Sequence, residues 1–255
     1  MSSAFDIKRV RADFPMLGRT VHGGKPLVFL DSGATSLKAR VVIDAESQFY
    51  AHDYGTVRRG IYSLSQQATA QFEGVRAKTG AFLNAADASE IVFTSGTTEA
   101  INLVANTFGR MSLRKGDRIL ISEMEHHANI VSWQLVAEQV GASLIAIPID
   151  DAGELAMDKL DGLLDERVKI VAIAHMSNVL GTVNPVAEIA RRAHAVGAKV
   201  LLDGAQSAPH IPVDVQALDC DFFVCSSHKM CGPTGVGVLY GRRAILDAMP
   251  PWQGG

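Results

Sequence analysis

The sequence predicts an α/β fold in which a mostly parallel sheet is covered by helices on both faces. Short apolar runs such as 91–94, 118–121 and 169–174 alternate with stretches that have helical periodicity. These runs are apolar throughout, as expected for strands that are buried on both faces. With 255 residues, 47% of them hydrophobic, the chain is long enough for one large domain with a real core.

The N-terminal part is predicted to hold three helices and one strand. A short helix covers 7–13 and ends before Pro15, because proline cannot continue a helix. A strand covers 27–30 and a second helix covers 39–51. A long helix covers 63–82, where polar and apolar positions mix at helical spacing.

The rest of the chain alternates between strands and helices. The predicted strands are 91–94, 118–121, 143–147, 169–174, 199–202, 221–225 and 237–240, and the predicted helices are 98–108, 130–139, 157–164, 185–196 and one from 242 onward. This alternation favours a largely parallel sheet, whose sites lie beyond the carboxyl ends of the strands. Thr97, His126, Asn178, Asp203 and Lys229 each follow a strand, so we expect them at one edge of the sheet.

The stretch Ser226-Ser227-His228-Lys229 is the strongest functional signal. It follows the apolar run 222–225 and precedes a glycine-rich turn. A lysine amine buried at a strand end has a lowered pKa and can act as a nucleophile. A carbonyl-bearing cofactor such as pyridoxal 5'-phosphate (PLP) would match it. A lysine that simply ends a strand fits the same stretch.

Two further strand ends suit PLP. Asp203 ends an apolar strand, and a carboxylate there would keep a pyridinium nitrogen protonated; an Asp in this position could equally cap the next helix. The segment 94–99 predicts a glycine turn and a helix start, where backbone N–H groups and hydroxyls suit a phosphate. Ser or Thr followed by Glu also predicts a simple capping box. Together the lysine, the carboxylate and the phosphate cradle favour a PLP site.

Five segments resemble the class V aminotransferase family, most closely its SufS-type cysteine desulfurases. They are LDSGATS (30–36), TSGTTEAIN (94–102), EMEHHAN (123–129), DGAQ (203–206) and SHK (227–229), in the family's order. The resemblance runs from about Phe14 to the last residue. It implies a PLP-dependent transferase of fold type I, here a truncated large domain. It also implies conversion of L-cysteine to L-alanine plus an enzyme-bound persulfide, whose sulfur feeds iron–sulfur cluster assembly.

The resemblance implies a role for each matching residue around the cofactor. Lys229 would be the Schiff-base lysine and, once freed, a general base and acid. Asp203 would pair with the pyridine nitrogen, and Gln206 would contact the phenolic oxygen. The phosphate would be held by Thr97, Thr98, Ser226 and His228.

Other matching residues concern the substrate side. His126 would lie flat over the PLP ring and shuttle protons, and Asn178 would lie near the substrate and the phenolic oxygen, although a turn asparagine fits too. Arg59 matches the family, whereas Arg58 replaces a histidine that lies near the substrate. We expect Arg58 to meet an anion, either the substrate or a neighbouring carboxylate. Carboxylates beside His126 and His127 would allow a metal, but adjacent histidines rarely face one ion, so no metal site is predicted.

Composition and charge narrow the class further. A net charge of -3 argues against a nucleic-acid surface, and no apolar run is long enough for a membrane span. The N-terminus has no apolar signal core. Cys220, Cys225 and Cys231 lack C-x-x-C spacing, and free thiols fit a reducing compartment. We therefore expect a cytoplasmic protein with no membrane partner.

Relatives of this kind are longer, so the resemblance identifies an N-terminal portion. Residues 1–25 would be an arm that packs with the small domain of full-length relatives, and residues 26–255 an incomplete PLP-binding large domain. The persulfide cysteine would lie further on, and this portion alone is expected to be inactive. Expected partners are L-cysteine or L-selenocysteine, a second copy in a homodimer, and a SUF-type sulfur acceptor. The alternatives are another class V PLP enzyme (a selenocysteine lyase, a kynureninase-like enzyme or an epimerase) or an inactive PLP-binding fragment.

Overall fold

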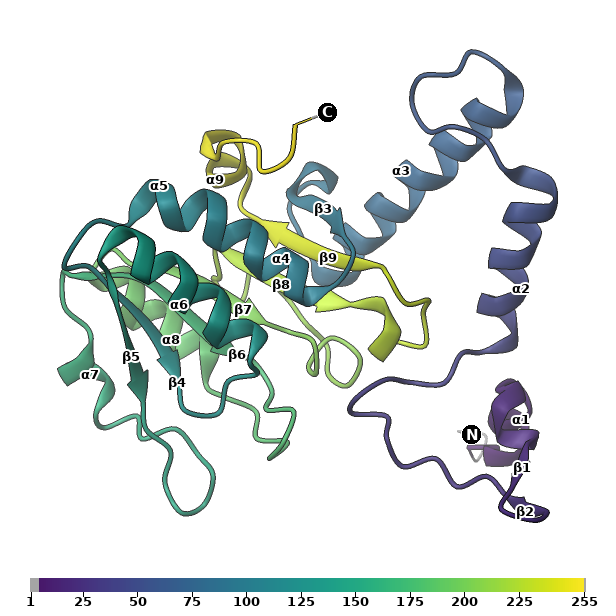
Figure 1. Ribbon diagram of the computed structural model, residues 1–255, viewed down its shortest axis with the longest axis horizontal. Helices are drawn as coiled ribbons and strands as arrows, with labels where there is room; N and C mark the ends of the chain where they lie inside the picture. The colour runs from purple at the N-terminus through teal and green to yellow at the C-terminus, as the bar shows by residue number, and fades with distance from the viewer. Residues whose placement is uncertain (1–4, 255) are drawn as a thin grey trace. The chain divides into compact units, whose positions relative to one another are not determined.

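The computed structural model describes residues 5–254, which form two compact units (Figure 1). Unit 1 comprises the chain up to Val75 together with Ser227–Thr234. Unit 2 comprises Arg76–Ser226 and the chain from Gly235 onward. The segment that carries Lys229 therefore belongs to unit 1, although strands of unit 2 precede and follow it in the chain. The predicted division into residues 1–25 and 26–255 stays a prediction.

Unit 1 contains the predicted helices, but the only strands among its described residues form a small hairpin that the sequence did not predict. Helix α1 (Ile7–Ala12) begins after Asp6, whose Oδ1 accepts hydrogen bonds from two backbone N–H groups of the first turn. Strands β1 (Thr20–Val21) and β2 (Lys25–Pro26) pair antiparallel. The predicted strand at 27–30 is wrong, because this apolar run has no partner strand and Leu30 is 91% exposed.

The remaining helices of unit 1 agree with the prediction. Helix α2 (Arg40–Gln48) continues into a π-helical turn at Phe49–Asp53. The long helix α3 (Ser63–Leu83) begins in unit 1 and ends in unit 2. A 3-10 turn at Pro15–Gly18 separates α1 from the hairpin.

Unit 2 is built on a seven-stranded sheet with the order β3-β9-β8-β7-β6-β4-β5. Strand β9 pairs antiparallel with both of its neighbours, and all the other neighbouring strands are parallel, which confirms a mostly parallel sheet. The strands are β3 (Ile91–Thr94), β4 (Arg118–Ser122), β5 (Ser143–Ile147), β6 (Val168–Ala174), β7 (Lys199–Asp203), β8 (Phe222–Ser226) and β9 (Gly237–Gly241).

Helices cover both faces of this sheet, as predicted (Figure 1). Helix α4 (Thr97–Val104), which continues through a π-helical turn into α5 (Arg110–Ser112), shares one face with α6 (Ala128–Val140). On this face Trp133 and Phe222 belong to the main apolar cluster. Helix α8 (Val186–Ala195) packs on the other face, against β6 and β7.

The two remaining helices are short. The predicted helix at 157–164 is reduced to one turn, α7 (Leu160–Leu163). Only Leu160 of this turn is fully buried, and Gly162 lowers helix propensity, so little holds a longer helix here. Helix α9 (Arg243–Ala248) follows β9. No helix within residues 5–254 is long and apolar enough to cross a membrane.

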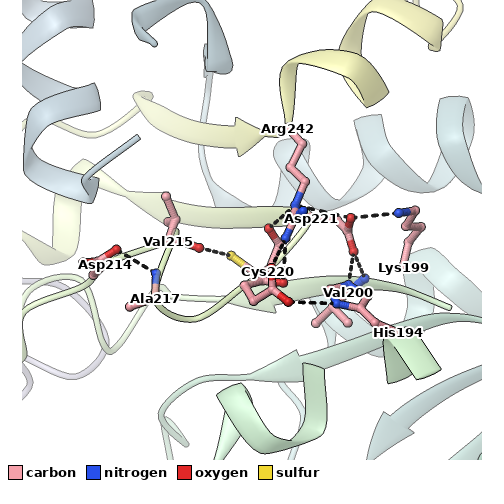
Figure 2. A network of polar contacts seen from close by, with 10 residues as sticks. His194, Lys199, Val200, Asp214, Val215, Ala217, Cys220, Asp221 and Arg242 are labelled. Atoms are coloured by element: carbon pink, nitrogen blue, oxygen red, sulfur yellow. Dashed lines mark hydrogen bonds and ion pairs between the residues drawn. The ribbon is translucent and has the colours of Figure 1, made fainter. Parts of the chain in front are cut away.

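A buried carboxylate links residues near the ends of β7, β8 and β9 (Figure 2). These strand ends lie at the edge of the sheet opposite the expected site. Asp221 is fully buried just before β8, and its Oδ2 lies 2.8 Å from both the Nε2 of His194 and the backbone nitrogen of Val200. Its Oδ1 lies 3.2 Å from the Nζ of Lys199 and 3.5 Å from the Nε of Arg242. Lys199 begins β7 and Arg242 follows β9, so this network stabilises the edge of the sheet away from the strands' carboxyl ends.

Candidate functional site

The topology of unit 2 gathers the predicted residues of that unit at one edge of the sheet. The paired residues Ala174 and Asp203 end two parallel strands. Ser226 and Thr94 end β8 and β3, and both pair with Gly237 of β9. His126 and Asn178 follow β4 and β6 in the chain. The candidate residues of unit 2 therefore lie near one edge of the sheet, as the order of strands and helices predicted.

A pair of buried hydroxyls lies at the start of α4. The Oγ of Ser226 is 2.8 Å from the backbone nitrogen of Thr97 and 2.7 Å from its Oγ1. The N-cap residue of α4 is Gly96, which has no side chain, so the capping box is not formed at this N-terminus. The Ser226 hydroxyl accepts from the Thr97 N–H instead, and the Glu99 carboxylate accepts from the Ser95 N–H. Helix N-terminal N–H groups and hydroxyls can bind a phosphate. The Thr98 side chain is exposed in the same turn.

Glycine is required opposite this helix start. A Cβ at Gly237 would lie 2.4 Å from the Cα of Gly96, a distance that no side chain tolerates. The absence of a side chain lets β9 approach the turn that begins α4. This close approach is a backbone requirement of the kind expected at phosphate-binding turns.

Asp203 is a buried carboxylate at the end of β7. Its side chain is 5% exposed, and its Oδ1 accepts a hydrogen bond of 2.9 Å from the backbone nitrogen of Ala205. The structure begins a turn, not a helix, after Asp203, so the carboxylate caps a turn rather than a helix. Gly204 follows because a Cβ there would lie 1.9 Å from the Phe223 ring. Gln206 is buried in the same turn.

Sequence reasoning missed the role of Glu125, which is buried beside this carboxylate. Its Oε1 accepts hydrogen bonds from the Ser122 hydroxyl at 2.5 Å and the Ala174 N–H at 2.9 Å, and its Oε2 accepts one of 2.7 Å from the Asn129 amide. Burial raises the pKa of Glu125 to about 7; these three donors oppose the shift, and the Asp203 carboxylate adds to it. Asn129 in turn accepts a hydrogen bond from the Trp133 indole, so residues 125, 129 and 133 continue one network along α6.

The two side chains predicted to face the substrate from unit 2 are exposed. His126 lies in the turn before α6, where its Nδ1 accepts a bond of 3.1 Å from the Ala128 N–H. Its ring stands at 89° to the ring of His127, with 6.4 Å between centroids. Asn178 lies in the loop after β6. Within the described part of the chain, no group of three or more His, Cys, Asp or Glu side chains could hold a metal ion.

A buried histidine lies next to Asp203. His175 is 5% exposed, and its backbone N–H donates to the Asp203 carbonyl at 2.9 Å. Burial lowers the pKa of its imidazole, and its Nδ1 has no hydrogen-bond partner among the described residues. A buried neutral imidazole with an unpaired nitrogen is unusual in a folded protein. In the sequence, nothing distinguishes His175 from an ordinary structural histidine.

Lys229 lies in unit 1, in the 3-10 turn Ser227–Lys229. Within this unit the segment 35–38 is bonded to that turn. The His228 Nδ1 lies 3.1 Å from the Thr35 hydroxyl, and the Cys231 N–H donates to the Ser36 hydroxyl at 2.7 Å. Burial lowers the pKa of His228, and the neighbouring Lys229 and Lys38 cations lower it further. Part of the LDSGATS segment therefore contacts the SHK segment directly.

Arg58 meets a carboxylate, one of the two anions expected for it. Its Nη2 lies 2.6 Å from the Oε1 of Glu73, and its guanidinium lies 5.9 Å from the centre of the Phe72 ring. Its φ of 75° lies in the left-handed region, and its N–H donates to Thr69. Arg59 is exposed beside it. The pairing with Glu73 occupies the Arg58 side chain within unit 1.

Comparison with known proteins gives one consistent result. The Aminotransferase class-V family matches residues 28–255. Curated cysteine desulfurases of Dickeya dadantii and an Enterobacter species are 59% and 57% identical over 98% and 99% of this chain. The chain spans 61% and 62% of the length of these two relatives.

Solved structures agree with the fold. The cysteine desulfurase CsdA of Escherichia coli is 43% identical, with a TM-score of 0.88 over 99% of this chain and 62% of that one. The apo cysteine desulfurase of Thermococcus onnurineus is 36% identical, with a TM-score of 0.91 over 100% of this chain and 62% of that one. These similarities confirm the predicted fold type I.

Enzymes of this family depend on PLP, and the residues of unit 2 fit that group. Asp203 offers a buried anion for the ring nitrogen, and the hydroxyls of Thr97 and Ser226 lie at a helix start for the phosphate. The family match, the identities and the sheet agree on the assignment. The chain belongs to the class V aminotransferase family.

Proposed function

We propose that this chain is the cofactor-binding portion of a PLP-dependent cysteine desulfurase of the SufS type. The whole enzyme would convert L-cysteine to L-alanine and retain the sulfur as a persulfide on a cysteine outside this chain. The observation that carries the proposal is the buried Asp203 carboxylate at the sheet edge, in a chain 59% identical to a cysteine desulfurase.

Each proposed role follows from chemistry that the side chain can perform. PLP, when bound, supplies an electron sink for the bond that breaks at the substrate Cα. Asp203, an anion shielded from water, would keep the ring nitrogen protonated. Thr97, Ser226, Thr98 and His228 would bind the phosphate through hydroxyl, backbone and ring donors. Gln206 would donate to the phenolic oxygen from its buried turn.

The proton transfers are assigned to two residues. The Lys229 amine would bind the cofactor covalently and then carry a proton to and from the substrate Cα. His126 would cover the ring and move a proton on the substrate side. Asn178, Arg58 and Arg59 are proposed to contact the substrate. For Arg58 this requires exchange of the Glu73 carboxylate for the substrate carboxylate, because the guanidinium is already paired.

Several finer proposals rest on the family resemblance alone. They are a homodimer, a SUF-type sulfur acceptor, delivery of sulfur to iron–sulfur cluster assembly, and a cytoplasmic location. Cross-linking and mass measurement of the full-length protein would test the dimer. Sulfur transfer from radiolabelled cysteine to purified candidate acceptors would test the partner.

Reductive trapping tests the central assignment. Full-length protein is mixed with PLP, reduced with borohydride and digested, and the modified peptide is sequenced. We expect the label on Lys229 and none in a Lys229→Ala variant, whereas Lys78→Ala, at an exposed position of α3, is labelled normally. A label on another lysine would refute the assignment. Alanine and sulfide release from L-cysteine, compared with L-selenocysteine and kynurenine, then tests the substrate.

A further inference from the structure

The carbonyl oxygen of His228 receives more hydrogen bonds than a backbone carbonyl usually accepts. The Ser36 N–H donates to it at 2.9 Å, and the Ser36 hydroxyl donates at 2.9 Å. The Thr35 hydroxyl donates at 3.2 Å, and the Lys38 ammonium donates at 3.0 Å. A carbonyl oxygen has two lone pairs, so four donors make this an unusually crowded acceptor.

This carbonyl belongs to the peptide bond that joins His228 to Lys229. A peptide unit is planar and rigid, so donors that hold its oxygen from several directions also restrict the nitrogen and Cα of the next residue. The position of the Lys229 Cα is therefore set by donors from segment 35–38. The structure assigns Thr35, Ser36 and Lys38 as positioning residues that hold Lys229 through the His228 carbonyl.

Lys38 is the strongest of these donors. An ammonium makes a charge-assisted hydrogen bond, which is stronger than a bond between neutral groups. Lys38 is half-buried, and its Nζ also donates to the Ser36 carbonyl at 2.7 Å. The ammonium therefore bonds both to its own segment and to the turn that carries Lys229. Burial lowers the pKa of Lys38, and the neighbouring Cys231 opposes this shift. All these contacts lie within unit 1.

A second contact locks the other side of the turn. Because the Ser36 hydroxyl donates its proton to the His228 carbonyl, its oxygen can accept the 2.7 Å bond from the Cys231 N–H. Cys231 has a φ of 61°, a conformation that is unfavourable for a residue with a side chain. The Ser36 hydroxyl therefore bridges the residues before and after Lys229. This bridge gives the turn two anchors.

The positioning role rests on the proposed function of Lys229, so the test separates the two. Lys38→Met keeps the apolar stem and removes the ammonium, whereas Lys38→Arg keeps a cationic donor. Lys8→Met, at an exposed position of unit 1, is the matched control. All variants are made in the full-length protein and studied with and without PLP.

Hydrogen exchange without PLP tests only whether the hydrogen bonds between segment 35–38 and the turn at Lys229 exist. We expect the amides of peptide 227–234 to exchange at least about tenfold faster in Lys38→Met, since a charged hydrogen bond is lost, with Lys38→Arg near wild type. Unchanged exchange would overturn the inference whatever the cofactor does.

The rate of reaction with PLP tests whether Lys38 positions Lys229. We expect the rate of covalent attachment to Lys229 to fall about tenfold in Lys38→Met, with kcat lowered and KM for L-cysteine kept, and both restored by Lys38→Arg. Faster exchange with an unchanged attachment rate would overturn positioning and leave only a structural contact. If wild-type protein is labelled at another lysine, the proposed function fails, and the exchange data still show whether the contacts exist.

Discussion

The pH dependence of stability should be dominated in one window by Glu125. Its carboxyl is 8% exposed, and its pKa is raised from the ordinary value of 4.5 to about 7, chiefly by burial. A raised carboxyl pKa means that the folded protein holds a proton that the unfolded chain has released between these two values. The free energy of unfolding therefore falls as the pH rises from about 4.5 to 7.

The size of this effect follows from the pKa shift. Each pKa unit corresponds to about 1.4 kcal/mol, so the complete shift is worth about 3 kcal/mol, most of which lies between pH 5 and 8. Glu125→Gln removes the titration. It also places an amide donor opposite the Asn129 amide or the Ser122 hydroxyl, so we expect a constant cost of about 1–3 kcal/mol as well.

Urea unfolding at several pH values separates these two contributions. Other groups titrate in both proteins, so the quantity to follow is the difference in unfolding free energy between wild type and Glu125→Gln. We expect this difference to shrink by about 2–3 kcal/mol from pH 5 to pH 8. The matched control is Glu138→Gln on the exposed side of α6. Its unfolding free energy should depend on pH in the same way as that of wild type. Parallel curves for Glu125→Gln would refute the buried, proton-holding carboxyl.

Three further substitutions test the structure at other points. Gly204→Ala drives a Cβ into the Phe223 ring and should lower the unfolding free energy by about 3 kcal/mol or more; a urea midpoint equal to wild type would contradict this. Asp221→Asn leaves Lys199 and Arg242 without their buried anion and should cost about 3–5 kcal/mol by the same measurement, whereas Asp247→Asn, an exposed control, should not; equal values would argue against the network. Asp203→Asn in the full-length enzyme should lower kcat by about 10²–10³-fold while PLP stays attached, and an unchanged kcat would remove Asp203 from the chemistry.

The sequence predicted most of the sheet because each strand of unit 2 is a short apolar run with clear ends. The runs at 91–94 and 143–147 match their strands residue for residue. The same signal failed at 27–30, because an apolar run does not reveal whether a partner strand exists. The run at 157–164 failed for a different reason, since a helical pattern that buries one leucine gains too little to form more than one turn.

The sequence could predict where a candidate residue lies when its position along a strand decides this, but not when packing does. Asp203 and Ser226 could be located because both end strands whose carboxyl ends share an edge. Glu125 could not, because in the sequence it looks like the exposed Glu123 two residues earlier. Only the packing of the β4–α6 turn onto β6 makes it a buried acid.

The hydroxyl pair at the start of α4 depends on a strand that no local pattern could place. Thr97 and Ser226 are 129 positions apart and follow or end two strands, β3 and β8, that do not pair with each other. The antiparallel strand β9 lies between those strands, and its first residue, Gly237, pairs with the last residue of each. Any side chain at Gly237 would collide with the backbone of Gly96 and push the start of α4 away from β8. The contact between the two hydroxyls is therefore a property of strand order and one missing Cβ. For this reason the segment TSGTTE alone can predict a phosphate-binding turn, whereas the contact between the two hydroxyls forms only in the complete sheet.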